Sequence, residues 1–329
     1  MRRRQFLTLL GGLAVSPHAV RAQQGERMRR IGVLMAIVEG DPEYQAFLGA
    51  FRDGLQKLGW TEAGNIRIDY RWTGAETDAI QRFAKELVAL QPDLILSSST
   101  ATTAALLKLT RTIPIIFTIA VDPIGSGFVA SLPRPGGNVT GFINLDPNMV
   151  GKWLELLKEI APHVTRVAAV YRPQTAPYFE IYLRPFKIAA QSLGMEAIVT
   201  PVSDMAGFES VCAAEASQPN SSIVLVPDPY MSAHRLEIAS VAARHRLPSV
   251  YYNRAFADAG GLMSYGNDIA DNYRRAAAYV NRVLRGEKPS ELPVQFPAKF
   301  DLVINLKAAK ALGLDVPSLL QQRADEVIE

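Results

Sequence analysis

The chain of 329 residues is long enough for two domains, and its hydrophobic fraction of 48% allows sizeable cores, which excludes a disordered or low-complexity protein. Its formal net charge of +3 at pH 7 is small for this length. The single cysteine, Cys212, excludes an intrachain disulfide.

The first residues contain the three parts of a secretory signal in order. Arg2, Arg3 and Arg4 precede an apolar run at 6–15, and small residues precede a cleavage point that we expect after Ala22. The order Arg-Arg-Gln-Phe-Leu also resembles the twin-arginine export signal. We therefore predict a cleaved, twin-arginine-like signal peptide at 1–22 and a periplasmic mature protein. A basic tail without an export role is the alternative.

Removal of this segment changes the electrostatics of the chain. It carries four arginines and no acidic residue, so cleavage lowers the formal charge from +3 to −1. A mature protein with this charge gives no support for nucleic-acid binding. No later segment offers about 20 uncharged apolar residues, the length of a membrane-spanning helix.

After the signal, apolar strand patterns alternate with segments of helical spacing. Strands are predicted at 30–35, 65–72, 93–97 and 113–118, and helices at 43–58, 78–90 and 101–110. Strands that alternate with helices indicate a parallel, doubly wound sheet.

The same order then occurs a second time. Strands are predicted at 166–171, 195–202, 222–226 and 247–252, and helices at 178–193 and 232–245. Further helices are predicted at 150–160 and 269–284, and a final helix follows the segment 300–305. Internal repetition of this kind indicates two α/β lobes of similar architecture.

Turn-rich or extended segments at 133–145, 260–266 and 292–297 are interpreted as three crossings between the lobes. We place the hinge at Gly141, Tyr265 and Gly266, because a few residues must absorb the backbone change. The predicted lobes are 29–143 with 266–296, and 144–265 with 297–329. Ordinary surface loops are the alternative interpretation of each segment.

A hydroxyl-rich turn, Ser97 to Thr100, which we call the serine turn, joins the third strand to the next helix. The free amides and dipole of a helix start attract an anion, so the turn is a candidate binding site for a carboxylate. Ser99 or Thr100 could instead simply cap the helix.

In facing parallel sheets, the ligand site lies beyond the carboxyl ends of the strands. The candidate ligand-binding residues at this edge are Glu39, Ser98, Ser99, Thr100, Ala120, Asp122, Tyr171, Tyr178, Asp228, Tyr230 and Asn253. In the arrangement that we expect, Ser99 and Thr100 hold a carboxylate, Asp228 or Glu39 an ammonium group, and Tyr171 or Tyr230 a ring. Each tyrosine could instead be a packing residue, and Asp228 could cap a helix.

Catalytic patterns are missing from the sequence. It contains no serine nucleophile elbow, no phosphate loop and no histidine pair at metal-ligand spacing. Cys212 lies in a helical pattern and is expected to be buried rather than nucleophilic. We therefore predict a binding protein that is not an enzyme and needs no cofactor or metal.

Several motifs carry a family resemblance that spans the mature chain. Gly-Leu-Met-Ser-Tyr-Gly at 261–266, Leu-Pro-Val-Gln-Phe-Pro at 292–297 and the long run at 299–314 resemble the ABC-transporter substrate-binding family, which includes tryptophan- and tyrosine-type binding proteins. So do 273–277, Asn-Val-Thr-Gly-Phe at 138–142 and the serine turn.

The resemblance implies a type I periplasmic binding fold whose two lobes close on a small solute and present it to an ABC permease in the inner membrane. We expect the ligand to be an amino acid or an aromatic carboxylate, and the protein to be a monomer. A receptor module that reports to a sensor is an alternative. An exported racemase or epimerase would need acid and base groups that this sequence does not pair.

Overall fold

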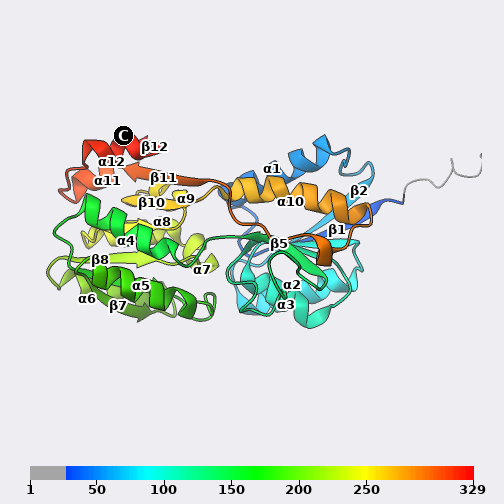
Figure 1. The fold of residues 1–329 in the computed structure, drawn as a ribbon, viewed down its shortest axis with the longest axis horizontal. Coiled ribbons are helices and arrows are strands. Elements are labelled where there is room, and N and C mark those ends of the chain that lie inside the picture. Colours follow the sequence, from blue (N-terminus) through cyan, green and yellow to red (C-terminus); the bar gives the residue numbers. More distant parts are fainter. Residues whose placement is uncertain (1–26) are drawn as a thin grey trace, which may run out of the picture.

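The computed structural model describes residues 27–329. The predicted signal peptide lies outside these residues. The described chain forms two lobes side by side, each built around one β-sheet (Figure 1).

The first lobe contains a five-stranded parallel sheet of order β2-β1-β3-β4-β5. Its strands are β1 (Arg29–Met35), β2 (Ile66–Trp72), β3 (Leu94–Ser97), β4 (Ile115–Ala120) and β5 (Val139–Ile143). Its helices are α1 (Pro42–Lys57), α2 (Thr77–Ala89), α3 (Thr100–Leu109) and α10 (Ile269–Leu284), with a 3-10 turn, η1 (Pro289–Glu291).

The second lobe contains a seven-stranded sheet of order β12-β11-β10-β9-β8-β6-β7, in which only β10 and β11 pair antiparallel. Its strands are β6 (Arg166–Tyr171), β7 (Glu196–Pro201), β8 (Ser221–Leu225), β9 (Ser249–Tyr251), β10 (Met263–Asn267), β11 (Phe300–Asn305) and β12 (Glu326–Ile328). Its helices are α4 (Met149–Ile160), α5 (Glu180–Ser192), α6 (Met205–Ala216), α7 (Pro229–Ala233), α8 (Arg235–Arg244), α9 (Arg254–Asp258), α11 (Leu306–Ala311) and α12 (Ser318–Arg323).

The two sheets repeat one topology. The order β2-β1-β3-β4 in the first lobe has its counterpart, β7-β6-β8-β9, in the second. This correspondence confirms the predicted internal repeat and the doubly wound α/β class.

Local sequence explains how α1 forms and where it packs. Asp41 accepts hydrogen bonds from the backbone amides of Glu43 and Tyr44 and so caps the helix, which has Pro42 in its first turn. The buried stripe of α1 includes Phe47 and Phe51, and Phe47 stacks on Tyr273 of α10 with 5.5 Å between ring centroids. The α1–α10 pair covers one face of the first sheet, and α2 and α3 cover the other (Figure 1).

Three segments differ from their predicted form. Residues 263–267 are a strand, β10, rather than part of a loop, and β5 begins at Val139 within the predicted turn. Gly141 has a φ of +151°, so this backbone can continue through a conformation that other residues avoid. The predicted final helix is two helices and a strand, because Gly313, with φ of +71°, ends α11.

The chain passes between the two sheets at three places. These are 144–148 between β5 and α4, Asp268 between β10 and α10, and 296–299 before β11. Phe142, just before the first connection, and Gln295, just before the third connection, form an isolated parallel bridge. Two connections therefore run side by side.

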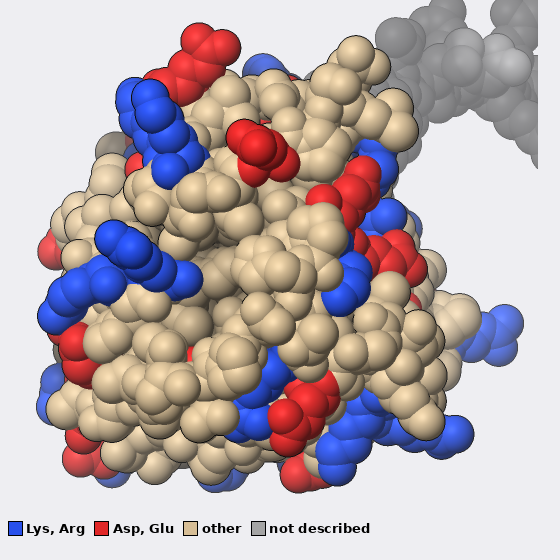
Figure 2. Space-filling model, turned by 90° about the vertical axis from the view of Figure 1, so that its left-hand side faces the viewer, with Lys and Arg blue, Asp and Glu red and all other residues tan. Residues whose placement is uncertain are grey.

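Figure 2 shows the end of the second lobe, where basic and acidic side chains are interspersed without a continuous basic surface. In residues 27–329, no helix is long and apolar enough to cross a membrane. Cys212 is fully buried, and burial raises the pKa of its thiol to about 12, so the thiol is unreactive at neutral pH.

Candidate functional site

A cavity lies between the lobes, at the carboxyl ends of their parallel strands. Ser98, Ser99 and Thr100 line it from the first lobe, and Tyr178 and Asp228 line it from the second. Its volume of about 30 Å³ is about the share of one water molecule in the liquid. An amino acid fits this cavity only after the lobes separate or side chains move.

The serine turn caps α3. Ser99 accepts a hydrogen bond from the amide of Thr102, and the Thr102 hydroxyl accepts one from the amide of Ser99, which makes a capping box. The Thr100 hydroxyl accepts a hydrogen bond from the amide of Val121 at 2.9 Å, and Ser98 Oγ accepts one from the amide of Ala36 at 2.7 Å. The capping interpretation is correct, and these hydroxyl oxygens already have protein partners.

The backbone of this turn remains available to an anion. The first intrahelical bond of α3 runs from the amide of Thr103 to the Ser99 carbonyl oxygen, so the amides of Thr100 and Ala101 precede it and lack an intrahelical acceptor. Together with the helix dipole, they favour a negative group in the cavity. The candidate donors to an anion at this turn are therefore backbone amides rather than hydroxyls.

Asp228 caps α7 from the opposite wall. Its Oδ1 accepts hydrogen bonds from the amides of Tyr230 and Met231, and its Oδ2 accepts from the Arg172 amide and the Thr175 hydroxyl. Burial raises the pKa of Asp228 to about 6, while these hydrogen bonds act in the opposite direction. All four lone pairs are engaged, so Asp228 offers an ammonium group its charge but no further lone pair.

Three tyrosines line the cavity. Tyr44 comes from α1, Tyr178 precedes α5 and Tyr252 follows β9. The Tyr178 hydroxyl donates to the carbonyl oxygen of Pro227 at 2.6 Å, and the Tyr252 hydroxyl donates to that of Asp228 at 2.8 Å. Burial raises the pKa of all three phenols, so they stay neutral and present ring faces and edges to the cavity.

Asn144 is a cavity residue that sequence reasoning missed. It follows β5, is 3% exposed, and its Oδ1 is buried without a hydrogen-bond partner among the described residues. A free amide oxygen at this point suits an ammonium group better than the fully engaged Asp228. Its position directly after a strand could have identified Asn144 from the sequence. For Tyr44, in the first turn of α1, the sequence contains no comparable signal.

Five of the predicted ligand residues do not line the cavity: Glu39, Ala120, Asp122, Tyr171 and Tyr230. Side chains alternate along a strand, and Ile119 and Val121 on either side of Ala120 face the cavity. Ala120 therefore points away from the cavity and is fully buried. Asp122 accepts a hydrogen bond from the amide of Gly125 and forms a local turn.

The other three have local surroundings that explain their positions. Glu39 is exposed in the loop before α1. The Tyr171 ring stacks on Phe179 with 3.8 Å between ring centroids, and the Tyr230 ring is covered by the Arg172 guanidinium at 4.3 Å. These rings therefore pack within the second lobe.

The remaining predicted residues lie at the cavity wall or beside the crossings. Asn253 lines the cavity and caps α9 by accepting a hydrogen bond from the amide of Ala255. Gly141 lies in β5, and Tyr265 and Gly266 lie in β10, each just before a connection between lobes. A side chain at Gly266 would place its Cβ 1.8 Å from the Tyr252 carbonyl oxygen, so this position requires glycine.

One ion pair joins the lobes next to the cavity. The Arg235 guanidinium of α8 donates to Asp41 Oδ2 at 2.6 Å, and the two side chains are 12% and 6% exposed. Asp41 also caps α1, so the pair links a helix start in one lobe to a helix start in the other. Among residues 27–329, no group of three or more metal-ligating side chains gathers.

Comparison with known proteins agrees with this geometry. A family model described as "ABC transporter substrate binding protein" matches residues 30–328. A tyrosine-binding protein of Clostridioides difficile is 26% identical over 296 residues, which is 88% of this chain and 82% of that protein.

Two solved structures have the same fold. A conserved domain protein of Vibrio cholerae is 30% identical with a TM-score of 0.84, covering 92% of this chain and 100% of its own. A Streptococcus pneumoniae ABC domain in complex with L-Trp is 26% identical, also with a TM-score of 0.84, covering 91% of this chain and 99% of its own. The predicted two-lobed, type I periplasmic binding fold is confirmed, and the chain belongs to the family of ABC-transporter substrate-binding proteins, which bind solutes and are not enzymes.

Proposed function

We propose that this protein binds an aromatic amino acid, tyrosine or tryptophan, between its lobes and delivers it to an ABC permease. The observation that carries the proposal is the cavity itself, which combines the start of α3 at Thr100, a free amide oxygen and three tyrosine rings. The relative described as a tyrosine-binding protein and the solved structure in complex with L-Trp support the same ligand class.

Each part of the ligand has a partner of suitable chemistry. The carboxylate accepts hydrogen bonds from the amides of Thr100 and Ala101 at the start of α3. The ammonium group donates to Asn144 Oδ1, and the charge of Asp228 stabilises it over a longer distance. The aromatic ring packs among Tyr44, Tyr178 and Tyr252.

Closure follows from a ligand that touches both lobes. Such a ligand favours the closed state by its higher affinity for that state, and the hinge at the three connections absorbs the motion. The hinge includes the backbone next to Gly141, Tyr265 and Gly266. The exported, periplasmic protein faces the membrane that holds the permease. The permease distinguishes the closed, loaded form from the open one. A sensor receptor would use the same closure and remains the second candidate, since it differs only in the partner.

A thermal denaturation screen tests the ligand class. A ligand at 100 times its dissociation constant stabilises the folded protein by about 2.7 kcal/mol, which is readily measured as a rise in Tm. We expect rises with L-tyrosine or L-tryptophan, and none with tryptamine, which lacks the carboxylate. A rise with sugars alone would refute the proposed ligand class.

A matched pair of variants tests the amide seat. Thr100→Ala removes the hydroxyl but keeps the backbone N–H, whereas Thr100→Pro removes both. Proline is tolerated here, because Thr100 is the first residue of α3 and Ser99 before it is extended, with φ of −160°. We expect Thr100→Pro to bind L-tryptophan about tenfold more weakly than Thr100→Ala in calorimetry. Equal affinities would exclude this N–H as a carboxylate donor.

A further inference from the structure

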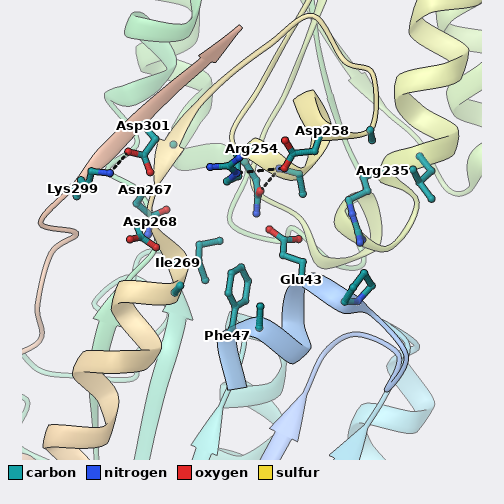
Figure 3. Close-up of a pocket in the computed structure, with 18 residues that line it drawn as sticks. Glu43, Phe47, Arg235, Arg254, Asp258, Asn267, Asp268, Ile269, Lys299 and Asp301 are labelled. Carbon is teal, nitrogen blue, oxygen red and sulfur yellow. Dashed lines mark hydrogen bonds and ion pairs between the residues drawn. The ribbon is translucent and has the colours of Figure 1, made fainter. Parts of the chain in front are cut away.

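A second, larger hollow lies beside the interlobe cavity. This groove has a volume of about 780 Å³, within the range of small-molecule sites. Residues of α1 and the start of α10 form its wall from the first lobe, and α9 and the segment 299–301 form its wall from the second (Figure 3). Apart from Asn253 and Ile269, which line both hollows, its residues have no part in the proposed amino-acid site.

Polar atoms without partners gather at this groove. Asn267 is 8% exposed, and among the described residues neither its Nδ2 nor its Oδ1 has a hydrogen-bond partner. Glu43 Oε2 is likewise buried without a partner. Leaving a buried donor or acceptor unpaired costs about 1–3 kcal/mol, and most such groups in folded proteins are paired. A ligand that satisfies these atoms would therefore be stabilised by them.

The charges of the groove favour a cation once Glu43 is ionised, which burial delays by raising its pKa to about 7. Its three basic side chains are already paired: Arg235 with Asp41, Arg254 with Asp258 and Glu326, and Lys299 with Asp301. Within the described chain, the acidic side chains of Glu43 and Asp268 lie at the groove without an ion-pair partner. Figure 3 shows the Glu43 carboxyl projecting from α1 towards α9.

The rest of the lining limits the size and polarity of a ligand. Phe47 and Ile269 supply an apolar floor between Glu43 on α1 and Asn267 at the end of β10, as Figure 3 shows. An amide binds another amide through one donor and one acceptor, which is what Asn267 offers. A short carbon chain with an ammonium group at one end and an amide at the other matches these three features.

We propose that the groove is a second ligand site that binds a small primary amine bearing an amide-like polar group, with the ammonium beside Glu43 and the polar group on Asn267. Its walls belong to both lobes, so the occupant contacts both of them in the closed form. The site is separate from the amino-acid cavity and needs none of its donors.

Calorimetry on the mature protein at about pH 8, where Glu43 is mostly ionised, with two probes of the same shape tests the site. γ-Aminobutyramide carries the ammonium group, and valeramide replaces it with a methyl group. We expect γ-aminobutyramide to bind at least about tenfold more tightly than valeramide, because a charge-assisted hydrogen bond is lost in the latter. Equal affinities, or no binding of γ-aminobutyramide, would overturn the proposal.

Three variants locate the amine. Glu43→Gln keeps the shape of the side chain without its charge, and Asn267→Ala removes an amide that makes no internal hydrogen bond, so both should fold. Each is expected to weaken γ-aminobutyramide about tenfold and to leave L-tryptophan affinity unchanged. Thr100→Pro should have the opposite pattern. Loss of amine binding in Thr100→Pro, or its retention in both groove variants, would place the amine elsewhere and refute the site.

Discussion

The ion pair between Arg235 and Asp41 is expected to control how readily the lobes close. Arg235→Met removes the guanidinium and leaves a carboxylate that is 6% exposed in the closed form. Removing one partner of a buried, hydrogen-bonded charge pair at an interface costs 2–5 kcal/mol or more. In the open form, water solvates Asp41, so the cost applies to closure rather than to folding. Asp41 keeps its cap on α1, because Oδ1 accepts those hydrogen bonds.

The lower end of this range predicts a measurable loss of ligand affinity. A cost of about 2 kcal/mol lowers the ratio of closed to open molecules about 30-fold, since about 1.4 kcal/mol corresponds to a factor of ten. Where the open form dominates without ligand, the dissociation constant for the aromatic amino acid rises by the same factor. We expect this rise in calorimetry, with little change in the Tm of the ligand-free protein.

A matched control separates closure from general charge loss. Arg323→Met breaks an exposed pair with Glu159, and both of these residues belong to the second lobe. It should leave ligand affinity unchanged, since exposed pairs contribute about 0–1 kcal/mol. If Arg235→Met folds and binds its ligand as tightly as the unmodified protein, the pair does not stabilise the closed form and the argument fails.

Three further predictions concern stability. Gly141→Ala places a Cβ 2.0 Å from the Phe117 carbonyl oxygen at a φ of +151°. We therefore expect the free energy of unfolding to fall by at least about 2 kcal/mol, with a lower Tm. As a control, Gly137→Ala should keep the Tm, because nothing lies within 4 Å of the added Cβ. Ser99→Ala removes the capping box of α3 and should lower the free energy of unfolding in urea by about 1 kcal/mol; an unchanged midpoint would contradict this role. Burial raises the pKa of Glu43 from 4.5 to about 7, so the folded protein holds this proton more tightly than the unfolded chain, and stability falls as pH rises through this window. Glu43→Gln should therefore gain stability relative to the unmodified protein between about pH 4 and about pH 8, and a constant difference would refute the shift.

Features that depend on residues close together in the chain could be predicted from the sequence. The repeated order of strands and helices, the turn after the third strand and the likeness at 261–266 and 292–314 depend on residues close in sequence, whose periodicity and turn chemistry indicate elements directly. The same local chemistry also predicted that Asp228 and Ser99 could cap helices, as they do.

Which side chains meet between the lobes was decided by tertiary structure. Ile119 and Val121 face the cavity while Ala120 between them is buried in the core, a choice that depends on strand register and not on residue type. Tyr178 lines the cavity while Tyr171 stacks inside its own lobe. Asp41 and Arg235 are 194 positions apart, and only the closure of one lobe on the other brings them together. Sequence periodicity describes one helix or strand at a time, whereas these contacts depend on how two separately folded lobes are oriented.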